Sequence, residues 1–303
     1  MKNNNKKVGK SLDDSIINSI AYFFSGLVLV LTLYPMVYII SASVSDPVRV
    51  ASGDLLLFPI GLTSDGYKII FDYDPIWIGY RNTLFYTVAG TLLNLFLTLP
   101  CAYALSRKDF RGKNVIMMVF VFTIFFRGGI IPTYLLMKDL SLTDTIWAML
   151  IPEAVSVFNL IITRTYYQNS IPYELQEAAL IDGCKNSRLF LFIILPLSKP
   201  IIAVITLYYA VHHWNSFFNA LIYLSNDKLY SLQLYLRNIL LEDMTLDIMS
   251  GDSEEMEALI RRMQLKESMK FGIVVVSSLP VLIIYPFIQK YFVKGVMIGA
   301  IKG

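Results

Sequence analysis

Hydrophobic residues along the chain gather in six long segments that are separated by more polar stretches. A helix needs about 20 residues to cross a hydrocarbon core about 30 Å thick, so each segment has the length of a transmembrane helix. The predicted spans are residues 16–40, 82–105, 115–137, 145–163, 201–224 and 271–292. The pattern therefore predicts an all-α polytopic membrane protein with six transmembrane helices.

Composition supports this prediction. Hydrophobic residues make up 55% of the 303 residues and charged residues only 16%, whereas soluble domains carry about a quarter charged residues. The chain lacks the polar surface of a cytosolic enzyme, and a net charge of +3 is too small to indicate a nucleic-acid partner. The first apolar segment exceeds the roughly 7 to 15 residues of a signal-peptide core, so we expect it to remain uncleaved.

The distribution of positive charge predicts the orientation. If residues 1–15 are cytoplasmic, fifteen Lys and Arg residues fall on the inner side. Nine fall on the outer side, six of them in the long segment 225–270, where they are mixed with nine acidic residues. Positive charge in short loops marks the cytoplasmic side of a membrane protein. We therefore expect the N-terminus and the tail, residues 290–303, to be cytoplasmic.

The outer segment 225–270 has apolar residues three or four apart, including Leu232, Leu236 and Ile239, and a second helical pattern at residues 254–265. This periodicity predicts helices. The segment is large enough to contact a partner protein, although a solvated loop would have the same composition. Cys101 and Cys184 are predicted to be small packing residues, because two isolated thiols favour neither a disulfide framework nor a metal site.

The predicted inner loop, residues 166–199, is longer and more apolar than the other inner connections. Pro172 stands where a first helical residue would be, and residues 173–182 are mostly strong helix formers. Gly183 then offers the left-handed conformation that ends many helices. A second short helix is expected at residues 187–195, stopped by Pro196 and redirected by Pro200.

This loop resembles the Glu-Ala-Ala loop of permease subunits in bacterial ATP-binding-cassette (ABC) importers. The family signature has fixed spacings, which are met here by Glu177, Ala178, Ala179, Gly183, Ile193, Leu195 and Pro196. Three further segments, residues 126–134, 213–221 and 294–303, are similar to the carbohydrate branch of that family, in particular to maltose-type second permeases that take oligosaccharides.

The resemblance implies a type I ABC importer transmembrane domain over residues 16–303 in the bacterial plasma membrane. The short inner helix would be a cytoplasmic coupling helix that contacts the ATPase through Glu174, Glu177, Ala178, Ala179, Asp182 and Gly183. The tail would reach the same ATPase through Gly299, Ala300, Ile301, Lys302 and Gly303.

The resemblance also implies the partners. They are a second, related permease, two copies of a cytoplasmic ATPase, and an extracellular solute-binding protein, expected to be a lipoprotein. ATP and Mg would be bound by the ATPase, so no cofactor, metal or catalytic residue is expected in this chain. The cargo would be a carbohydrate.

Polar residues inside the apolar segments are candidates for the pore. Arg127 and Glu153 would both lie near mid-bilayer, where charges are costly unless paired. They are interpreted as an ion pair with a structural or gating role, or as contacts to the solute. The other candidates are Asn159, His213, Trp214, Asn215 and Asn219. Aromatic rings and amides around the adjacent His212 and His213 suit a sugar, although packing between helices would use the same residues.

Two other classes remain open on the sequence. An ion-coupled secondary transporter of a polar solute would use an intramembrane carboxylate, and Glu153 is the one candidate. A membrane-embedded hydrolase or glycosyltransferase would need a converging set of catalytic residues, and the spans show none with convincing spacing.

Overall fold

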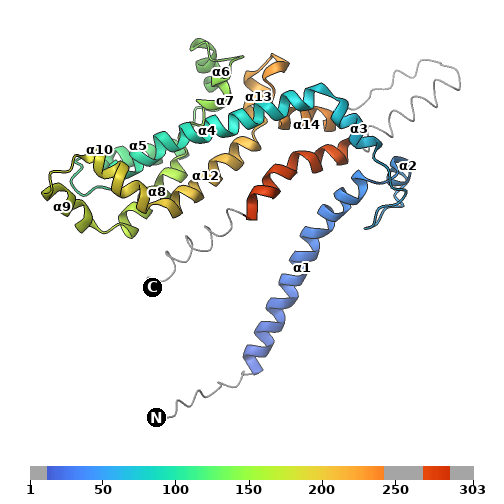
Figure 1. Cartoon of the computed structure of the whole chain (residues 1–303), viewed down its shortest axis with the longest axis horizontal. Helices are drawn as coiled ribbons and strands as arrows, with labels where there is room; N and C mark the ends of the chain where they lie inside the picture. The colour runs from blue at the N-terminus through green and yellow to red at the C-terminus, as the bar shows by residue number, and fades with distance from the viewer. Residues whose placement is uncertain (1–11, 242–268, 287–303) are drawn as a thin grey trace. The chain divides into compact units, whose positions relative to one another are not determined.

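The computed structural model describes residues 12–241 and 269–286, and the regular secondary structure in these ranges is helical. Figure 1 shows the elements in chain order. They are α1 (Leu12–Ser43), α2 (Pro47–Ala51), α3 (Asp65–Asp72), α4 (Asp74–Ser106), α5 (Lys113–Phe125), α6 (Ile130–Asp139), α7 (Trp147–Leu150), α8 (Val157–Ser170), α9 (Tyr173–Ile181), α10 (Asn186–Leu189), the π-helical η1 (Phe190–Ile194), α11 (Leu195–Leu197), α12 (Lys199–Trp214), α13 (Phe218–Tyr223), the 3₁₀ turn η2 (Asp227–Leu229) and α14 (Leu232–Leu241). An unlabelled last helix covers Met269–Pro286.

Three described helices are long and apolar enough to cross a membrane: Ile16–Ser43, Asp74–Ser106 and Met269–Pro286. Two sharply bent helix pairs raise the number to five if each pair counts as one span. The all-α prediction agrees with this, whereas the count of six spans stays a prediction.

The third predicted span is not one straight helix. The helix α5 ends at Phe125 and α6 begins at Ile130, with a bend of 114° between them. Gly129 has a φ of 84°, a left-handed conformation that costs little only for glycine. Arg127 therefore lies exposed in the non-helical turn, and its predicted place in the middle of a helical span is wrong.

The fourth predicted span is also interrupted. The helix α7 ends at Leu150 and α8 starts at Val157, which leaves a non-helical segment, here called the α7–α8 break (residues 151–156). Pro152 lies within it, and proline both lacks a donor and disfavours the helical conformation of the residue before it. Glu153 consequently lies in irregular backbone rather than on a helix.

The described chain falls into two compact units, one with residues 12–72 and 269–276 and the other with residues 73–241 and 277–286. In the first unit the end of α1 is tied to the segment after α2, because Ser41 Oγ donates to the Leu57 carbonyl at 2.6 Å. Tyr38 also packs edge-on against Phe271, with ring centroids 6.0 Å apart.

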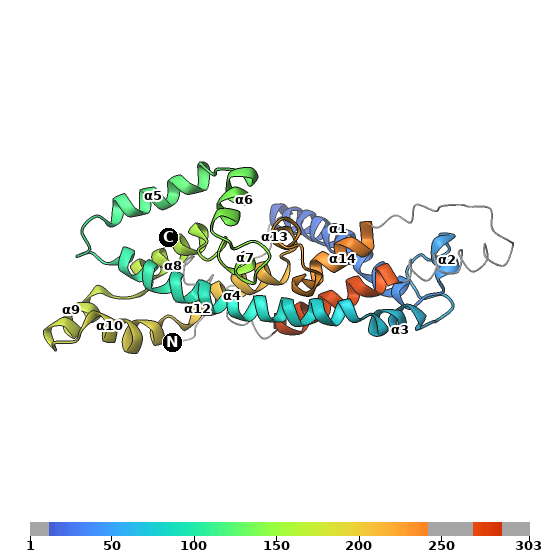
Figure 2. The same ribbon diagram turned by 90° about the horizontal axis from the view of Figure 1, so that it is seen from above.

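In the second unit α4 is the central helix, and α8 and α12 run beside it in both views (Figures 1 and 2). Polar or small residues recur on α4 at intervals of four. They are Asn82, Tyr86, Gly90, Asn94 and Thr98, all buried. Residues four apart are neighbours on a helix surface, so these residues form a stripe that winds along α4 and meets several neighbouring segments.

The N-terminal part of this stripe holds the segment before α14. Asn82 Nδ2 donates to the carbonyls of Lys228 and Tyr230 at 2.7 and 3.0 Å, and the Tyr86 hydroxyl donates to the carbonyl of Leu229 at 2.8 Å. The helix expected around Leu232 is confirmed as α14. The second expected helix, residues 254–265, lies outside the described residues.

Candidate functional site: the inner loop and the pocket

The helix α9 lies within the inner loop and confirms the predicted short helix. Pro172 is its N-cap, with a ψ of 136°, one position earlier than expected. At the other end Gly183 has a φ of 72°. Its N–H bonds to the carbonyl of Leu180 at 3.0 Å and the Cys184 N–H to that of Ala179 at 2.8 Å. These are the two bonds of a Schellman motif, so the chain reverses sharply at Gly183, as predicted.

The second half of the loop is helical over α10, η1 and α11. Pro196 lies inside α11, and the helical segment ends one residue after it, at Leu197, rather than at Pro196 as predicted. The redirection appears at Ser198, where this helical segment and α12 meet at 83°. Pro200 then sits in the first turn of α12.

Most of the predicted contact residues of α9 face outward. Glu174, Glu177, Ala178, Asp182 and Gly183 are all exposed. Next to them Ile181 is 85% exposed, and Leu175 and Leu180 are also exposed. Ala179 is the exception, because it is buried in a hydrophobic cluster that includes Tyr103 and Tyr167. It therefore fixes α9 in place, whereas Ala178 alone offers a small surface where another backbone can approach.

Residues of α4, α5 and α8 near the loop support it through one hydrophobic cluster. Tyr103 of α4 stacks on Phe190 with centroids 5.2 Å apart and meets Tyr167 edge-on at 5.9 Å. Cys101 and Cys184 both pack against this cluster, which confirms their predicted packing role. The exposed helix α9 thus packs on a hydrophobic cluster that includes the C-terminal end of α4.

Charged groups reinforce the same base just after α4. Arg107 is buried and donates from Nε and Nη2 to the two carboxylate oxygens of Asp109, at 2.8 and 2.6 Å. Its Nη1 donates to the Tyr103 hydroxyl at 2.9 Å. These charge-assisted bonds lower the pKa of Asp109 and raise the pKa of Arg107. Lys108 Nζ also lies 4.5 Å from the centre of the Tyr173 ring, at the start of α9.

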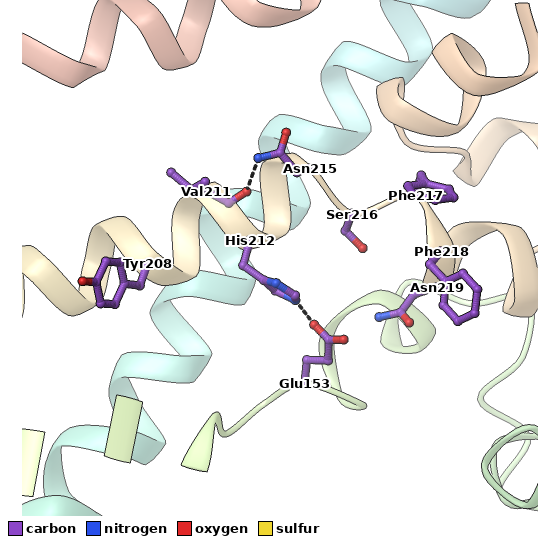
Figure 3. A pocket seen from close by; sticks show the side chains of 9 residues that line it. All are labelled: Glu153, Tyr208, Val211, His212, Asn215, Ser216, Phe217, Phe218 and Asn219. Atoms are coloured by element: carbon purple, nitrogen blue, oxygen red, sulfur yellow. Dashed lines mark hydrogen bonds and ion pairs between the residues drawn. The ribbon is translucent and has the colours of Figure 1, made fainter. Parts of the chain in front are cut away.

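A pocket of about 450 Å³ lies at the ends of α12 and α13 beside the α7–α8 break (Figure 3). It combines polar groups with aromatic rings. The lining residues are Glu153, Tyr208, Val211, His212, Asn215, Ser216, Phe217, Phe218 and Asn219.

Glu153 and His212 contact each other across this pocket (Figure 3). Their side chains are 40% and 51% exposed, so the pair is accessible. The buried ion pair expected between Glu153 and Arg127 is wrong, because the carboxylate meets a histidine and Arg127 lies in the exposed turn between α5 and α6. The predicted pair required both residues to lie on continuous helices. Arg127 instead lies in the turn between α5 and α6, and Glu153 lies in the α7–α8 break.

The other predicted pore residues divide between pocket and packing. Asn215 and Asn219 line the pocket. His213 and Trp214 are buried, and the indole Nε1 donates to the Ser277 carbonyl at 3.1 Å. Asn159 is buried in the first turn of α8. These last three residues serve helix packing, the alternative that the sequence left open.

The α7–α8 break is held by the polar stripe of α4 and by α12. Asn94 Nδ2 donates to the carbonyls of Glu153 and Ala154 at 2.7 and 2.8 Å. The Tyr209 hydroxyl accepts from the Ser156 N–H at 3.1 Å. Irregular backbone at membrane depth is tolerated where protein groups satisfy its hydrogen bonds, and these two side chains do so.

From the sequence, His213 rather than His212 was the pore candidate, and the polar stripe of α4 was not recognised. The four-residue spacing of Asn82, Tyr86, Gly90, Asn94 and Thr98 was a visible signal. No such signal tells the two histidines apart. They are consecutive on one helix, and the sequence does not show which of them points toward the pocket.

Comparison with known proteins identifies the family. A family model described as "Binding-protein-dependent transport system inner membrane component" matches residues 75–298. The chain belongs to this family of importer permeases. Its fold is that of a type I ABC importer permease, as the resemblance implied.

Two relatives of the permease come from Bacillus subtilis (strain 168). The "Polygalacturonan/rhamnogalacturonan transport system permease protein YtcP" is 38% identical over 292 residues, covering 96% of this chain and 100% of the relative. "Protein LplC" is 38% identical over 300 residues, covering 99% and 97%.

A solved structure agrees with these relatives. The permease matches a chain in the crystal structure of a bacterial ABC transporter involved in the import of the acidic polysaccharide alginate. The TM-score is 0.83 and the identity 35%, with 93% of this chain and 98% of that chain covered.

Proposed function

We propose that the permease moves a carbohydrate, an oligosaccharide, inward across the bacterial plasma membrane, and that ATP hydrolysis in a separate subunit drives it through the inner loop. The supporting observation is the build of α9. Its acidic residues and several of its apolar residues are exposed, while Ala179 anchors it in the hydrophobic cluster that includes Tyr103. A short helix exposed on one side and anchored on the other transmits a push to the helices beneath it.

The remaining partners follow from this assignment. A second, related permease completes the pore, two ATPase copies bind ATP and Mg below it, and an extracellular binding protein delivers the solute. Both termini are cytoplasmic in this arrangement, and the segment 225–270 faces the binding protein. The predicted ATPase contacts in the tail, residues 299–303, lie outside the described residues.

The chemistry of the pocket supports a sugar as cargo. The rings of Tyr208, Phe217 and Phe218 offer faces on which the apolar side of a sugar stacks, and Asn215 and Asn219 offer amides for its hydroxyls. The names of the relatives point the same way, since one transports polygalacturonan or rhamnogalacturonan and the matched structure concerns alginate. Both are polymers of acidic sugars, so uronate oligosaccharides are the first cargo to test.

Co-purification with a tagged permease tests the assembly. We expect a second permease and an ATPase to travel with it, and the reconstituted complex with its binding protein to import oligogalacturonates only when ATP is supplied. Uptake driven by a proton or sodium gradient without ATP would contradict the proposal and support the ion-coupled alternative.

A charge reversal tests the inner loop. Glu177→Lys is expected to lower cargo-stimulated ATP hydrolysis at least about tenfold, because an exposed carboxylate that meets a cation on the ATPase would become repulsive. Asp72→Lys, at an exposed position at the end of α3, is the matched control and should leave coupling unchanged. Normal coupling in Glu177→Lys would refute this role.

A further inference from the structure

The contacts of Asn94 determine how its amide is oriented. The side chain is fully buried on α4. Its Nδ2 donates to the carbonyls of Glu153 and Ala154 at 2.7 and 2.8 Å, which uses both amide hydrogens. The amide oxygen, Oδ1, therefore points the other way, and it lies 2.7 Å from His213 Nε2.

This orientation assigns the proton on His213. Because Asn94 Oδ1 can only accept a hydrogen bond, Nε2 of His213 must donate one. The buried ring fits beside α4 only because residue 90 is glycine, since a Cβ there would lie 2.4 Å from Nε2. The histidine thus acts as a hydrogen-bond donor that fixes the asparagine.

The α7–α8 break is held from two directions as a result. His213 holds the backbone of Glu153 through Asn94, and the adjacent His212 contacts the carboxylate directly. Consecutive residues on a helix point about 100° apart. Two neighbouring residues of α12 therefore act on Glu153, one on its carboxylate and the other, through Asn94, on its backbone carbonyl. Figure 3 shows the carboxylate and the His212 ring meeting over the pocket.

We propose that Asn94 and His213 are positioning residues, which hold the backbone at Glu153 so that its side chain lies against His212 in the pocket. For transport, which rests on the proposed function, this means that a passing sugar replaces the Glu153–His212 contact with bonds from its own hydroxyls. Gly90 supplies the space for this arrangement.

A cross-linking experiment tests the positioning without a cargo or an ATPase. Glu153→Cys and His212→Cys are combined in the full chain, with Cys101→Ala and Cys184→Ala, and membranes are treated with a short bis-methanethiosulfonate reagent. The cysteines remove the side-chain contact, so the yield reports backbone position alone. Adding Asn94→Ala is expected to lower the yield about fivefold or more, because the Glu153 and Ala154 carbonyls lose their donor.

A matched control lies on the same helix. Asn82 also donates its amide to two carbonyls, but in the segment before α14. Asn82→Ala is therefore expected to leave the cross-linking yield unchanged. An unchanged yield in Asn94→Ala, or an equal loss in both variants, would overturn the proposal.

Two further variants test whether His213 donates from Nε2. They also test the proposal if Asn94→Ala fails to insert into the membrane. The amide nitrogen of glutamine lies near the place of histidine Nε2, and that of asparagine near Nδ1. His213→Gln should keep the yield within about twofold of the parent, whereas His213→Asn should lower it as Asn94→Ala does. Equal yields from these two variants would refute the role of His213. Because neither partners nor cargo enter the assay, its outcome is independent of the co-purification result.

Discussion

The inner loop and the pocket both rest on α4, but they are assembled over different distances along the chain. Every residue that shapes the reversal at Gly183 lies within five positions of it. The pocket instead brings together Glu153 and residues 208–219, and a side chain at position 94 holds it in place. A locally closed loop stays rigid as a unit, whereas a site at helix interruptions depends on remote hydrogen bonds.

This difference teaches where each site is sensitive. The inner loop should fail when its backbone or its anchor is changed, because its exposed side chains depend on both. The pocket should keep its stability when its exposed side chains are changed and lose it when its buried supports are removed. Four predictions test this contrast.

The largest effect is expected at the anchor of the inner loop. Tyr103→Ala removes a buried ring that contacts Phe190 and Tyr167, and truncating a buried aromatic residue costs about 3–5 kcal/mol. The thermal unfolding temperature of the purified complex and its cargo-stimulated ATP hydrolysis should both fall. Phe96→Ala, on the same helix but 75% exposed, is the control. Equal losses in the two variants would show that the anchor has no special role.

The next effect concerns the backbone at Gly183. Nothing lies within 4 Å of a Cβ added there, so Gly183→Val acts through its φ of 72° alone, at about 1–2 kcal/mol. We expect a severalfold loss of coupling between ATP hydrolysis and uptake, with normal membrane insertion. Gly112→Val makes a control of equal strain, since Gly112 has a φ of 85° and open space around it. Uncoupling by both variants would mean that backbone strain in either loop is enough.

A smaller effect on stability is expected in the pocket. Glu153→Gln and His212→Gln each remove one partner of a contact whose side chains are about half exposed, and exposed pairs contribute about 0–1 kcal/mol. Thermal unfolding should shift by only a few degrees in either variant, while the uptake rate changes clearly. The double variant should behave like the single ones. A large loss of stability would show that the pair is a structural support.

The smallest effect is a pH dependence beside the anchor. Arg107 lowers the pKa of Asp109 from its ordinary value of 3.8, so the ionised carboxylate stabilises the folded chain near neutral pH. This contribution is lost as the pH falls below about 4 and through the lowered pKa. Asp109→Asn should lower the unfolding temperature by about 1–2 °C at pH 7, since the carboxylate is half exposed. The two proteins should converge at acid pH, and a constant difference would contradict this role.

Much of the inner loop was predictable because its determinants are consecutive. The helix formers of α9 and the glycine after it appear in order, and the structure confirms the helix and the chain reversal that they predict. The spans were harder to predict. Hydropathy does not register that Gly128–Gly129 and Pro152 interrupt apolar segments, so two of them were wrongly drawn as straight helices.

The pairing of charges failed for the same reason. Arg127 and Glu153 looked like partners only while both stood on unbroken helices. Once each falls in an interruption, neighbours from α12 decide what Glu153 contacts. The two histidines could not be ranked, because packing against Gly90 selects which ring is buried.

The amino-acid sequence by itself determined the helical, membrane-spanning class and the shape of the inner loop. Apolar length and local backbone preference act over a few turns, and both can be counted along the chain. Only the tertiary structure decided which polar residues meet in the pocket. Those contacts join α4, the α7–α8 break and α12 across more than a hundred residues, and their hydrogen bonds exist only when the three segments pack together.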